Sequence, residues 1–362
     1  MRQSVRLVKT PDGVTLAWTS VGQGPPLVKA ANWLTHIEYD LDSPVWRHWI
    51  RFFAEHFEFI RYDERGCGLS DRVVDDVSPP RWIEDLETVV GAAEPAPPFL
   101  LLGISQGSAA AISYATRHPE RVSRLILYGA YPLGWAKRGN VRGEEAYRAI
   151  VQLTRIGWGQ DNPVYRQLFT SRFMPGATPE QIGWFNELCR KTTTPEMATK
   201  LMEARSQVDV EDLLGQVRVP TLVIHARDDE AVPFGQARIL ATEIPGAKLV
   251  PLDSRNHILL EDEPAWEQFQ EAVLSFTGQP AAAAHGAEDP IFAALSNRER
   301  EILVELTRGR TNAEIGRRLF ISEKTVRNHI TRIFEKLGVR SRAQAIVLTK
   351  DKAFDGRRRE AT

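Results

Sequence analysis

A serine lies in a setting that suits nucleophilic catalysis. Ser105 is the centre of G-I-S-Q-G at residues 103–107, which follows the apolar run 99–102 and precedes the small-residue run 108–111. Glycines on both sides of the serine favour a sharp turn from strand to helix, which lifts the hydroxyl above the sheet. A G-x-S-x-G match alone is a weak signal, so the prediction of a nucleophile depends on the strand and the helix around it.

The acid and the base that such a nucleophile needs follow it in the order expected of this motif. Asp229 lies in the loop after an apolar run, and its neighbour Asp228 is the alternative acid. His257 lies in the next loop that follows a strand-like run. A serine hydroxyl needs a base within hydrogen-bond reach, and a buried carboxylate fixes the tautomer of that base. We therefore predict a triad of Ser105, His257 and Asp229.

The elements that must position this triad alternate between strands and helices as far as residue 277. Apolar, β-rich runs occur at 14–19, 25–28, 57–62, 99–102, 124–128, 221–225 and 248–252. Helical patterns separate most of these runs. The alternation predicts an α/β fold with a mostly parallel sheet covered by helices on both faces.

The alternation is interrupted from residue 131 to about residue 208. This segment is rich in helix formers and aromatic residues. Because it falls between the nucleophile and the acid, we expect a helical cap over a pocket; a helical extension packed elsewhere on the sheet is the alternative. The residues expected to line the pocket are Trp33, Tyr131, Trp135, Trp158, Phe173 and Trp184.

Residues 5–277 resemble a capped α/β-hydrolase, and the segment RYDERGCGLS at 61–70 is similar to that family's loop after its fourth strand. The resemblance implies an eight-stranded sheet and an oxyanion hole made by the backbone N–H groups of Trp33 and Gln106. Where the family often has His-Gly after the third strand, this chain has Ala-Asn-Trp at 31–33. A backbone N–H group serves in an oxyanion hole whatever its side chain.

The C-terminal part of the chain carries the signals of four short helices. Capping boxes are expected at Ser296 with Glu299, Thr311 with Glu314 and Ser341 with Gln344, a further N-cap at Ser322, and glycine C-caps at Gly309 and Gly338. In the helix that begins at Ser322, apolar residues recur with helical spacing and predict one buried face. These residues are Val326, Ile330, Ile333 and Leu337.

The other face of that helix is basic and polar. It carries Lys324, Thr325, Arg327, Asn328, Thr331, Arg332 and Lys336. Arginine and asparagine read base edges in the major groove, and lysine binds phosphate. On charge alone, a solvated helix in a protein-binding bundle is an equal alternative.

Residues 295–346 resemble the four-helix helix-turn-helix (HTH) domain of the LuxR family, most clearly in TNAEI at 311–315 and SEKTVRNH at 322–329. The resemblance implies duplex DNA as a partner and base-edge roles for Arg327, Asn328 and Thr331. It also implies dimerisation through the final helix near residues 343–347.

Charge supports a division into two domains. Residues 291–362 hold 17 Lys and Arg against 9 Asp and Glu, a net charge of +8, whereas the rest of the chain carries −9. A basic domain on an acidic body indicates a polyanionic partner for the basic domain only. We predict a hydrolase domain at 1–277, a linker at 278–290 and an all-α DNA-binding domain at 291–362.

Composition further limits the classes of protein to which this chain can belong. The two cysteines form no disulfide framework and have no metal-ligand spacing, and we expect neither a metal nor a cofactor. No signal-peptide pattern or membrane-length apolar run is present, so we expect a cytoplasmic protein without a membrane partner. The two family resemblances together imply a bacterial regulator that senses a small molecule and binds DNA as a homodimer. An active serine esterase or amidase with a DNA-binding tail, and a scaffold with an inactive triad, are the alternatives.

Overall fold

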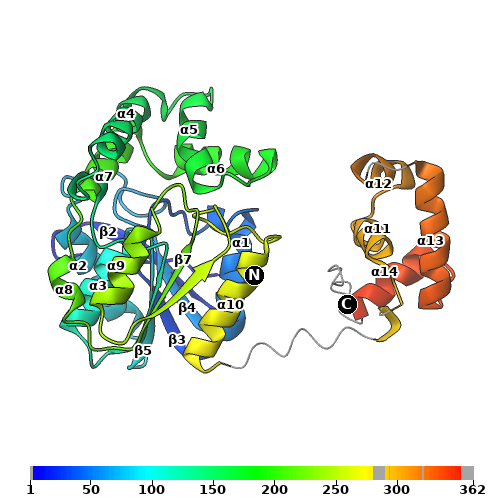
Figure 1. Cartoon of the computed structure of the whole chain (residues 1–362), viewed down its shortest axis with the longest axis horizontal. Helices are drawn as coiled ribbons and strands as arrows, with labels where there is room; N and C mark the ends of the chain where they lie inside the picture. The colour runs from blue at the N-terminus through cyan, green and yellow to red at the C-terminus, as the bar shows by residue number, and fades with distance from the viewer. Residues whose placement is uncertain (1–2, 280–289, 293, 320–321, 352–362) are drawn as a thin grey trace. The chain divides into compact units, whose positions relative to one another are not determined.

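The chain forms two compact units, which divide between residues 279 and 280. The computed structural model describes residues 3–279, 290–292, 294–319 and 322–351 (Figure 1). Most of the expected linker, residues 280–289, lies outside the described residues. Gly278 ends the last helix of the first unit, and Pro290 begins a short 3-10 turn of the second.

The first unit is built on one eight-stranded sheet, in the order β1-β2-β4-β3-β5-β6-β7-β8. The strands are β1 (Arg6–Lys9), β2 (Thr15–Val21), β3 (Pro26–Lys29), β4 (Glu58–Tyr62), β5 (Phe99–Ile104), β6 (Val122–Tyr128), β7 (Thr221–Ala226) and β8 (Lys248–Leu252). β2 pairs antiparallel with β1 and β4, and every other pair is parallel. The expected eight-stranded, mostly parallel sheet is therefore confirmed. β1 is a largely exposed edge strand, and its sequence contains no apolar run from which a strand could be predicted.

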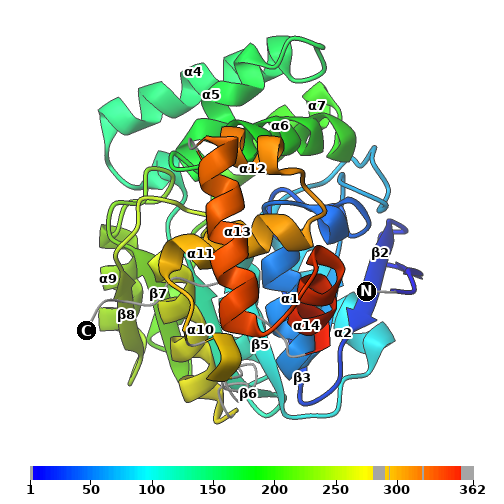
Figure 2. The same ribbon diagram turned by 90° about the vertical axis from the view of Figure 1, so that its right-hand side faces the viewer.

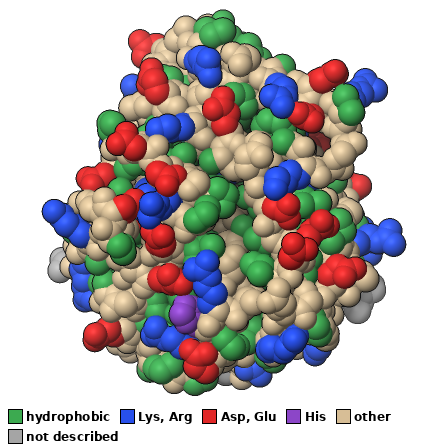
Figure 3. Space-filling view, turned by 90° about the vertical axis from the view of Figure 1, so that its left-hand side faces the viewer, with side chains coloured by type: hydrophobic (Ala, Val, Ile, Leu, Met, Phe, Trp, Pro, Cys, Tyr) green, Lys and Arg blue, Asp and Glu red, His purple; other side chains and the backbone are tan. Residues whose placement is uncertain are grey.

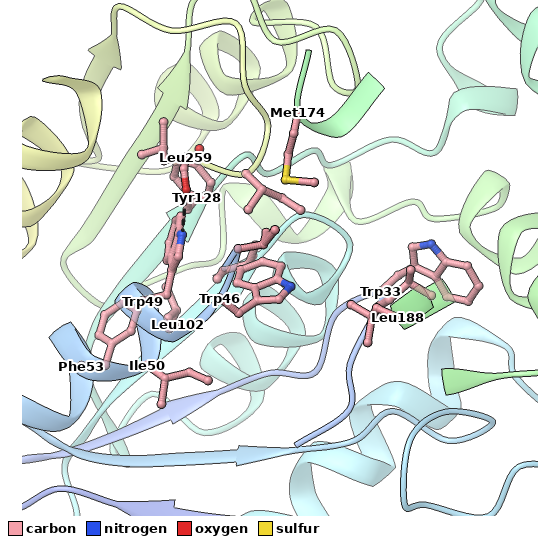
Figure 4. Close-up of a cluster of buried hydrophobic side chains, with 14 of the residues drawn as sticks. Trp33, Trp46, Trp49, Ile50, Phe53, Leu102, Tyr128, Met174, Leu188 and Leu259 are labelled. Carbon is pink, nitrogen blue, oxygen red and sulfur yellow. Dashed lines mark hydrogen bonds between the residues drawn. The ribbon is translucent and has the colours of Figure 1, made fainter. Parts of the chain in front are cut away.

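Helices cover both faces of this sheet (Figure 1). One face carries α1 (Arg47–His56) and α10 (Pro264–Thr277), and the other carries α2 (Pro79–Ala93), α3 (Gly107–Arg117), α8 (Glu211–Leu214) and α9 (Gly235–Glu243). Each face has its own apolar core. On the α1 side, the indole of Trp49 packs on Phe53 and donates a hydrogen bond of 3.1 Å to the carbonyl of Leu259 (Figure 4). On the side of this unit that carries α2, α3, α8 and α9, Figure 3 shows acidic, basic and apolar side chains interspersed over the surface.

Four helices inserted between β6 and β7 form the cap. They are α4 (Val141–Gly157), α5 (Val164–Phe173), α6 (Pro179–Thr192) and α7 (Pro195–Ser206). Their apolar side chains, among them Trp158, Phe169 and Phe185, join the core that α1 and α10 share. Because cap residues and Ser105 line one pocket, the insertion lies over the carboxyl end of β5 (Figures 1 and 2).

The second unit is helical. After the 3-10 turn Pro290–Phe292 come α11 (Asn297–Thr307), α12 (Asn312–Arg318), α13 (Glu323–Leu337) and α14 (Arg342–Asp351). Capping boxes are present at Ser296 and Thr311, and Ser322 caps α13 as expected. Gln344 departs from the expected box, because its side chain accepts from the backbone N–H of Arg340 instead of Ser341.

The helices of the second unit share a small apolar core. It is formed by Phe292, Leu295, Ile302, Leu303, Leu306, Ile315, Val326, Ile333, Leu337 and Ala345. Gly338 takes the left-handed conformation and ends α13, as the sequence predicts. Ile330, the fourth residue of the predicted apolar face of α13, is half-buried. In the described parts of both units, no helix is both long and apolar enough to cross a membrane.

Candidate active site and nucleic-acid interface

Ser105 occupies a strained turn between β5 and α3. Its φ of +52° lies in the left-handed region that residues with a Cβ rarely adopt. The flanking glycines are required by close contacts. A Cβ on Gly103 would lie 2.6 Å from the Cα of Ser108, and a Cβ on Gly107 would lie 2.6 Å from the carbonyl oxygen of Ala31. The turn therefore brings the β5 end, the α3 start and the chain after β3 together around the serine.

Asp229 and His257 form a hydrogen-bonded pair. His257 Nδ1 lies 2.6 Å from Asp229 Oδ2, and both side chains are almost fully buried. The backbone N–H groups of Ala231 and Val232 each donate to Asp229 Oδ1 at 2.8 Å. Burial favours the neutral form of Asp229, but the charge and hydrogen bond of His257, with smaller contributions from His225 and the Val232 N–H, together hold the pKa of the carboxyl below its usual value. Asp228, the alternative acid, is exposed.

The hydrogen bond that would join His257 to Ser105 is absent from the described structure. The outer nitrogen of His257, Nε2, is buried and has no hydrogen-bond partner among the described residues. Ser105 Oγ has none there either. The structure therefore brings the acid and the base together, whereas no hydrogen bond joins the base to the serine. In free enzymes such bonds are often long and shorten when substrate binds.

Two residues that line the pocket of Ser105 have unpaired backbone N–H groups in the described structure. Those of Trp33 and Gln106 donate to no other described residue. Both residues line the same pocket as Ser105. Two free donors beside a nucleophile are the elements of an oxyanion hole.

Most of the expected aromatic residues line this pocket, but two do not. Its lining consists of Trp33, Ser105, Gln106, Tyr131, Trp135, Arg138, Tyr147, Phe169, Phe173, Met202, Arg205, Ala231 and Val232. Trp158 packs behind the wall, with its ring centroid 5.5 Å from that of Trp33. Trp184, which the sequence also predicted in the pocket, lies elsewhere: it is half-buried on α6 and stacks on Tyr39, with the ring centroids 4.6 Å apart.

Sequence reasoning missed the charged residues of the pocket. Arg138 and Arg205 both line it. Arg205 comes from α7 and pairs with Glu64, which follows β4. Burial raises the pKa of Glu64, and Arg205 opposes that shift. The cap and the loop after β4 come together only in the folded chain. A local sequence pattern therefore could not predict the contact between Arg205 and Glu64.

The cap is hydrogen-bonded directly to the loop that carries His257, here called the histidine loop. The carbonyl of Phe173, at the end of α5, accepts from the backbone N–H of His257 at 2.8 Å and of Ile258 at 3.1 Å. The Phe173 ring lines the pocket, and its centroid lies 5.4 Å from that of His257. A ligand that moves Phe173 would therefore displace the histidine.

In the second unit, α13 presents most of the expected polar face. Lys324, Arg327, Asn328, Thr331 and Arg332 are exposed. Within α13, Arg327 Nη2 lies 3.5 Å from Glu323 Oε1, and the hydroxyl of Thr331 donates to the carbonyl of Arg327. The two remaining residues of the face are bound to residues outside it. Thr325 is half-buried and its hydroxyl lies 2.7 Å from that of Ser322. Lys336 Nζ donates to Glu299 at 2.6 Å, and this carboxylate also accepts from the backbone N–H of Ser296. We expected Lys336 to bind phosphate, but its ammonium group is bound to a buried carboxylate.

Comparisons with known proteins agree with both units. Residues 48–264 match the family described as "Serine aminopeptidase, S33", and residues 293–349 match "Bacterial regulatory proteins, luxR family". The fold and the site define a capped α/β-hydrolase joined to a helix-turn-helix domain. The chain belongs to the first family over more than half its length, and its C-terminal unit belongs to the second. This fusion makes it a DNA-binding regulator.

Individual relatives divide between the two units. The "AB hydrolase superfamily protein YisY" of Bacillus subtilis (strain 168) is 28% identical over 264 residues, 69% of this chain and 91% of that protein. "Spore germination protein GerE" of the same organism is 55% identical over 53 residues, 15% of this chain and 72% of GerE. Among solved structures, an esterase from Exiguobacterium antarcticum (EaEST) superposes with a TM-score of 0.64 at 25% identity, covering 75% of this chain and 99% of the esterase.

Proposed function

We propose that this regulator is controlled by a small molecule that binds under the cap, and that its C-terminal unit binds promoter DNA as a homodimer. The observation that carries the proposal is the pocket itself, in which a strained serine, two free backbone N–H groups and an aromatic wall meet. A concave, mostly apolar site with a few convergent polar groups is the usual form of a ligand site. Since the partner is genomic DNA, we place the protein in the cytoplasm.

Hydrolysis is the second candidate, favoured by the 2.6 Å bond between His257 and Asp229. In this reaction Ser105 Oγ attacks an ester or amide carbonyl while His257 Nε2 accepts its proton. Asp229 stabilises the resulting imidazolium. The N–H groups of Trp33 and Gln106 stabilise the tetrahedral oxyanion. His257 then returns the proton to the leaving group, and water cleaves the acyl-enzyme by the same route.

A ligand controls DNA binding only if it binds two states of the protein with different affinities. The contact from Phe173 to the histidine loop supplies one route, because α10 begins at Pro264, shortly after that loop, and leads to the second unit along the chain. We infer that occupancy of the pocket shifts α10 and so favours one arrangement of the two DNA-binding units.

Labelling of Ser105 tests both candidates. A fluorophosphonate probe is incubated with the full-length protein and with a Ser105→Ala variant, and the affinity for a DNA duplex is then measured by fluorescence anisotropy. We expect covalent labelling of the wild type only, with a changed DNA affinity. Labelling without any change in affinity would refute sensing and leave the esterase. The absence of labelling would refute the catalytic assignment of the triad.

The DNA interface is tested separately. We propose base contacts for Arg327, Asn328 and Thr331 and phosphate contacts for Lys324 and Arg332, because all five side chains are exposed on α13. DNA affinity should fall steeply with salt as counterions are released. The full-length protein should be dimeric on paired half-sites about one helical turn apart. A monomeric mass at micromolar concentration, with and without DNA, would count against the dimer.

A further inference from the structure

We propose that the pocket beside Ser105 selects a small molecule with an aromatic or apolar body and a carboxylate group, and that Arg205 binds this carboxylate. The inference rests on the proposed function, because it names the ligand class of the same pocket. Its basis is the unsatisfied hydrogen-bonding capacity of one buried arginine.

Arg205 is only 7% exposed and lines the pocket. Its Nη2 donates to both carboxylate oxygens of Glu64, at 2.8 and 2.6 Å. Its other two nitrogens, Nε and Nη1, are buried and have no partner among the described residues. A buried charged donor without an acceptor is costly, so an acceptor brought by a ligand would be bound strongly.

The guanidinium group is held in place before any ligand arrives. Its Cζ lies 4.5 Å from the centroid of the Trp33 ring and 5.8 Å from that of Trp82. Glu64 binds one nitrogen, and the indole of Trp33 packs against the guanidinium group. A preorganised arginine loses little conformational entropy when it binds an anion.

The charge of the pocket wall supports the same ligand class. Among the residues that line it, the charged ones are Arg138 and Arg205, and none is acidic. Arg138 lies with its Cζ 4.8 Å from the Tyr131 ring centroid and donates through Nε to the carbonyl of Leu133. Glu64 offsets one positive charge, so the second remains. The rest of the wall is largely aromatic or apolar, which suits a hydrophobic body.

Ser105 and Arg205 line one cavity, so one small ligand can contact both. With the carboxylate on Arg205 and a second carbonyl group at Ser105, a hemiester or half-amide of a short dicarboxylic acid fits the chemistry of both ends. A simple carboxylic acid would use the arginine end alone. This allows the binding test to be independent of turnover.

The test compares two probes of nearly equal shape. 3-Phenylpropanoate carries the carboxylate, and 3-phenylpropanamide replaces it with a neutral amide. Binding to the full-length protein is measured by isothermal titration calorimetry at constant salt. We expect the acid to bind about tenfold or more tightly than the amide, because charge-assisted hydrogen bonds are roughly twice as strong as neutral ones.

Two variants test whether Arg205 binds the ligand carboxylate or only forms a structural ion pair with Glu64. Glu64→Gln removes the competing carboxylate, so affinity for the acid should rise about threefold or more while that for the amide stays constant. Glu64→Gln combined with Arg205→Gln removes both buried charges, and the preference for the acid should disappear. Arg255→Gln is the control, since Arg255 is an exposed arginine of the same unit that also pairs with a glutamate, Glu230.

Each outcome is decisive. Equal affinities for acid and amide in the wild type, or weaker binding of the acid by Glu64→Gln, would overturn the carboxylate site while leaving the pocket as a ligand site. Binding of neither probe would also overturn this ligand class, and the change in DNA affinity on fluorophosphonate labelling of Ser105 would then decide whether the proposed function survives. If the double variant does not fold, the sign of the Glu64→Gln effect still decides, because a structural ion pair predicts no gain.

Discussion

Gly129→Ala is expected to disable Ser105 by pushing His257 out of position. Gly129 follows β6 with a φ of +56°. A Cβ at this position would lie 2.7 Å from His257 Cε1 and 3.1 Å from Nδ1. The histidine ring therefore occupies the space that any side chain at position 129 would need.

The size of the effect follows from this geometry. To reach ordinary contact at 3.4 Å, Cε1 must move by about 0.7 Å, and Nδ1 is tied to Asp229 at 2.6 Å. A misplacement of 1 Å can cost about a hundredfold in rate, so we expect fluorophosphonate labelling of Ser105 to slow by about ten- to a hundredfold. The left-handed backbone adds a loss of about 1–2 kcal/mol in the free energy of unfolding.

The assay measures the labelling rate and the free energy of unfolding of the same samples. Gly246→Ala is the matched control, because Gly246 also has a positive φ, +72°, but its Cβ would meet nothing within 4 Å. Both variants should lose similar stability, whereas only Gly129→Ala should lose labelling. Equal labelling rates in the two variants would show that His257 is not the base for Ser105.

Three further predictions concern Asp229 and the DNA-binding unit. The folded pKa of Asp229 lies below its unfolded value of about 3.9, so its ionisation stabilises the fold above that pH and this stability is lost as the pH falls through the folded value. Asp229→Asn should thus cost about 2–3 kcal/mol at pH 7 by denaturant unfolding, with a smaller difference below about pH 4; a constant difference would contradict this. Lys336→Ala removes the partner of Glu299 and should destabilise the second unit by about 1–2 kcal/mol, whereas Lys324→Ala should cost almost nothing; equal melting temperatures would refute the distinction. Arg327→Ala should weaken DNA binding by about 1–3 kcal/mol at one or two base positions, while Lys324→Ala should weaken all sequences alike; anisotropy on a panel of operator variants distinguishes these patterns.

The sequence alone was sufficient for features that depend on local chemistry. The glycines around Ser105, the caps at Ser296 and Thr311, and the left-handed Gly338 each impose a conformation within a few residues, and the structure has these conformations. Alternation of strand and helix likewise predicted the mostly parallel sheet. The eight-stranded count came from the family resemblance, because β1 has no apolar pattern of its own.

Contacts between distant segments were decided only by the tertiary structure. Trp184 and Phe173 are both aromatic residues of the cap, yet α6 turns Trp184 toward Tyr39 while the end of α5 directs Phe173 into the pocket. A sequence pattern identifies a helix but does not orient it against a neighbour that is far away in the chain.

The same limit applies to charge. Lys336 and Arg205 belong to helices whose sequences give no sign of a partner, and their carboxylates lie 37 and 141 residues away. Both carboxylates are buried only in the assembled fold. Glu299 binds Lys336 and thereby gives it a structural role, whereas Glu64 binds Arg205, which lines the pocket. The sequence therefore determined which chemical groups the protein has, and the packing of its helices determined which of them a ligand or DNA can reach.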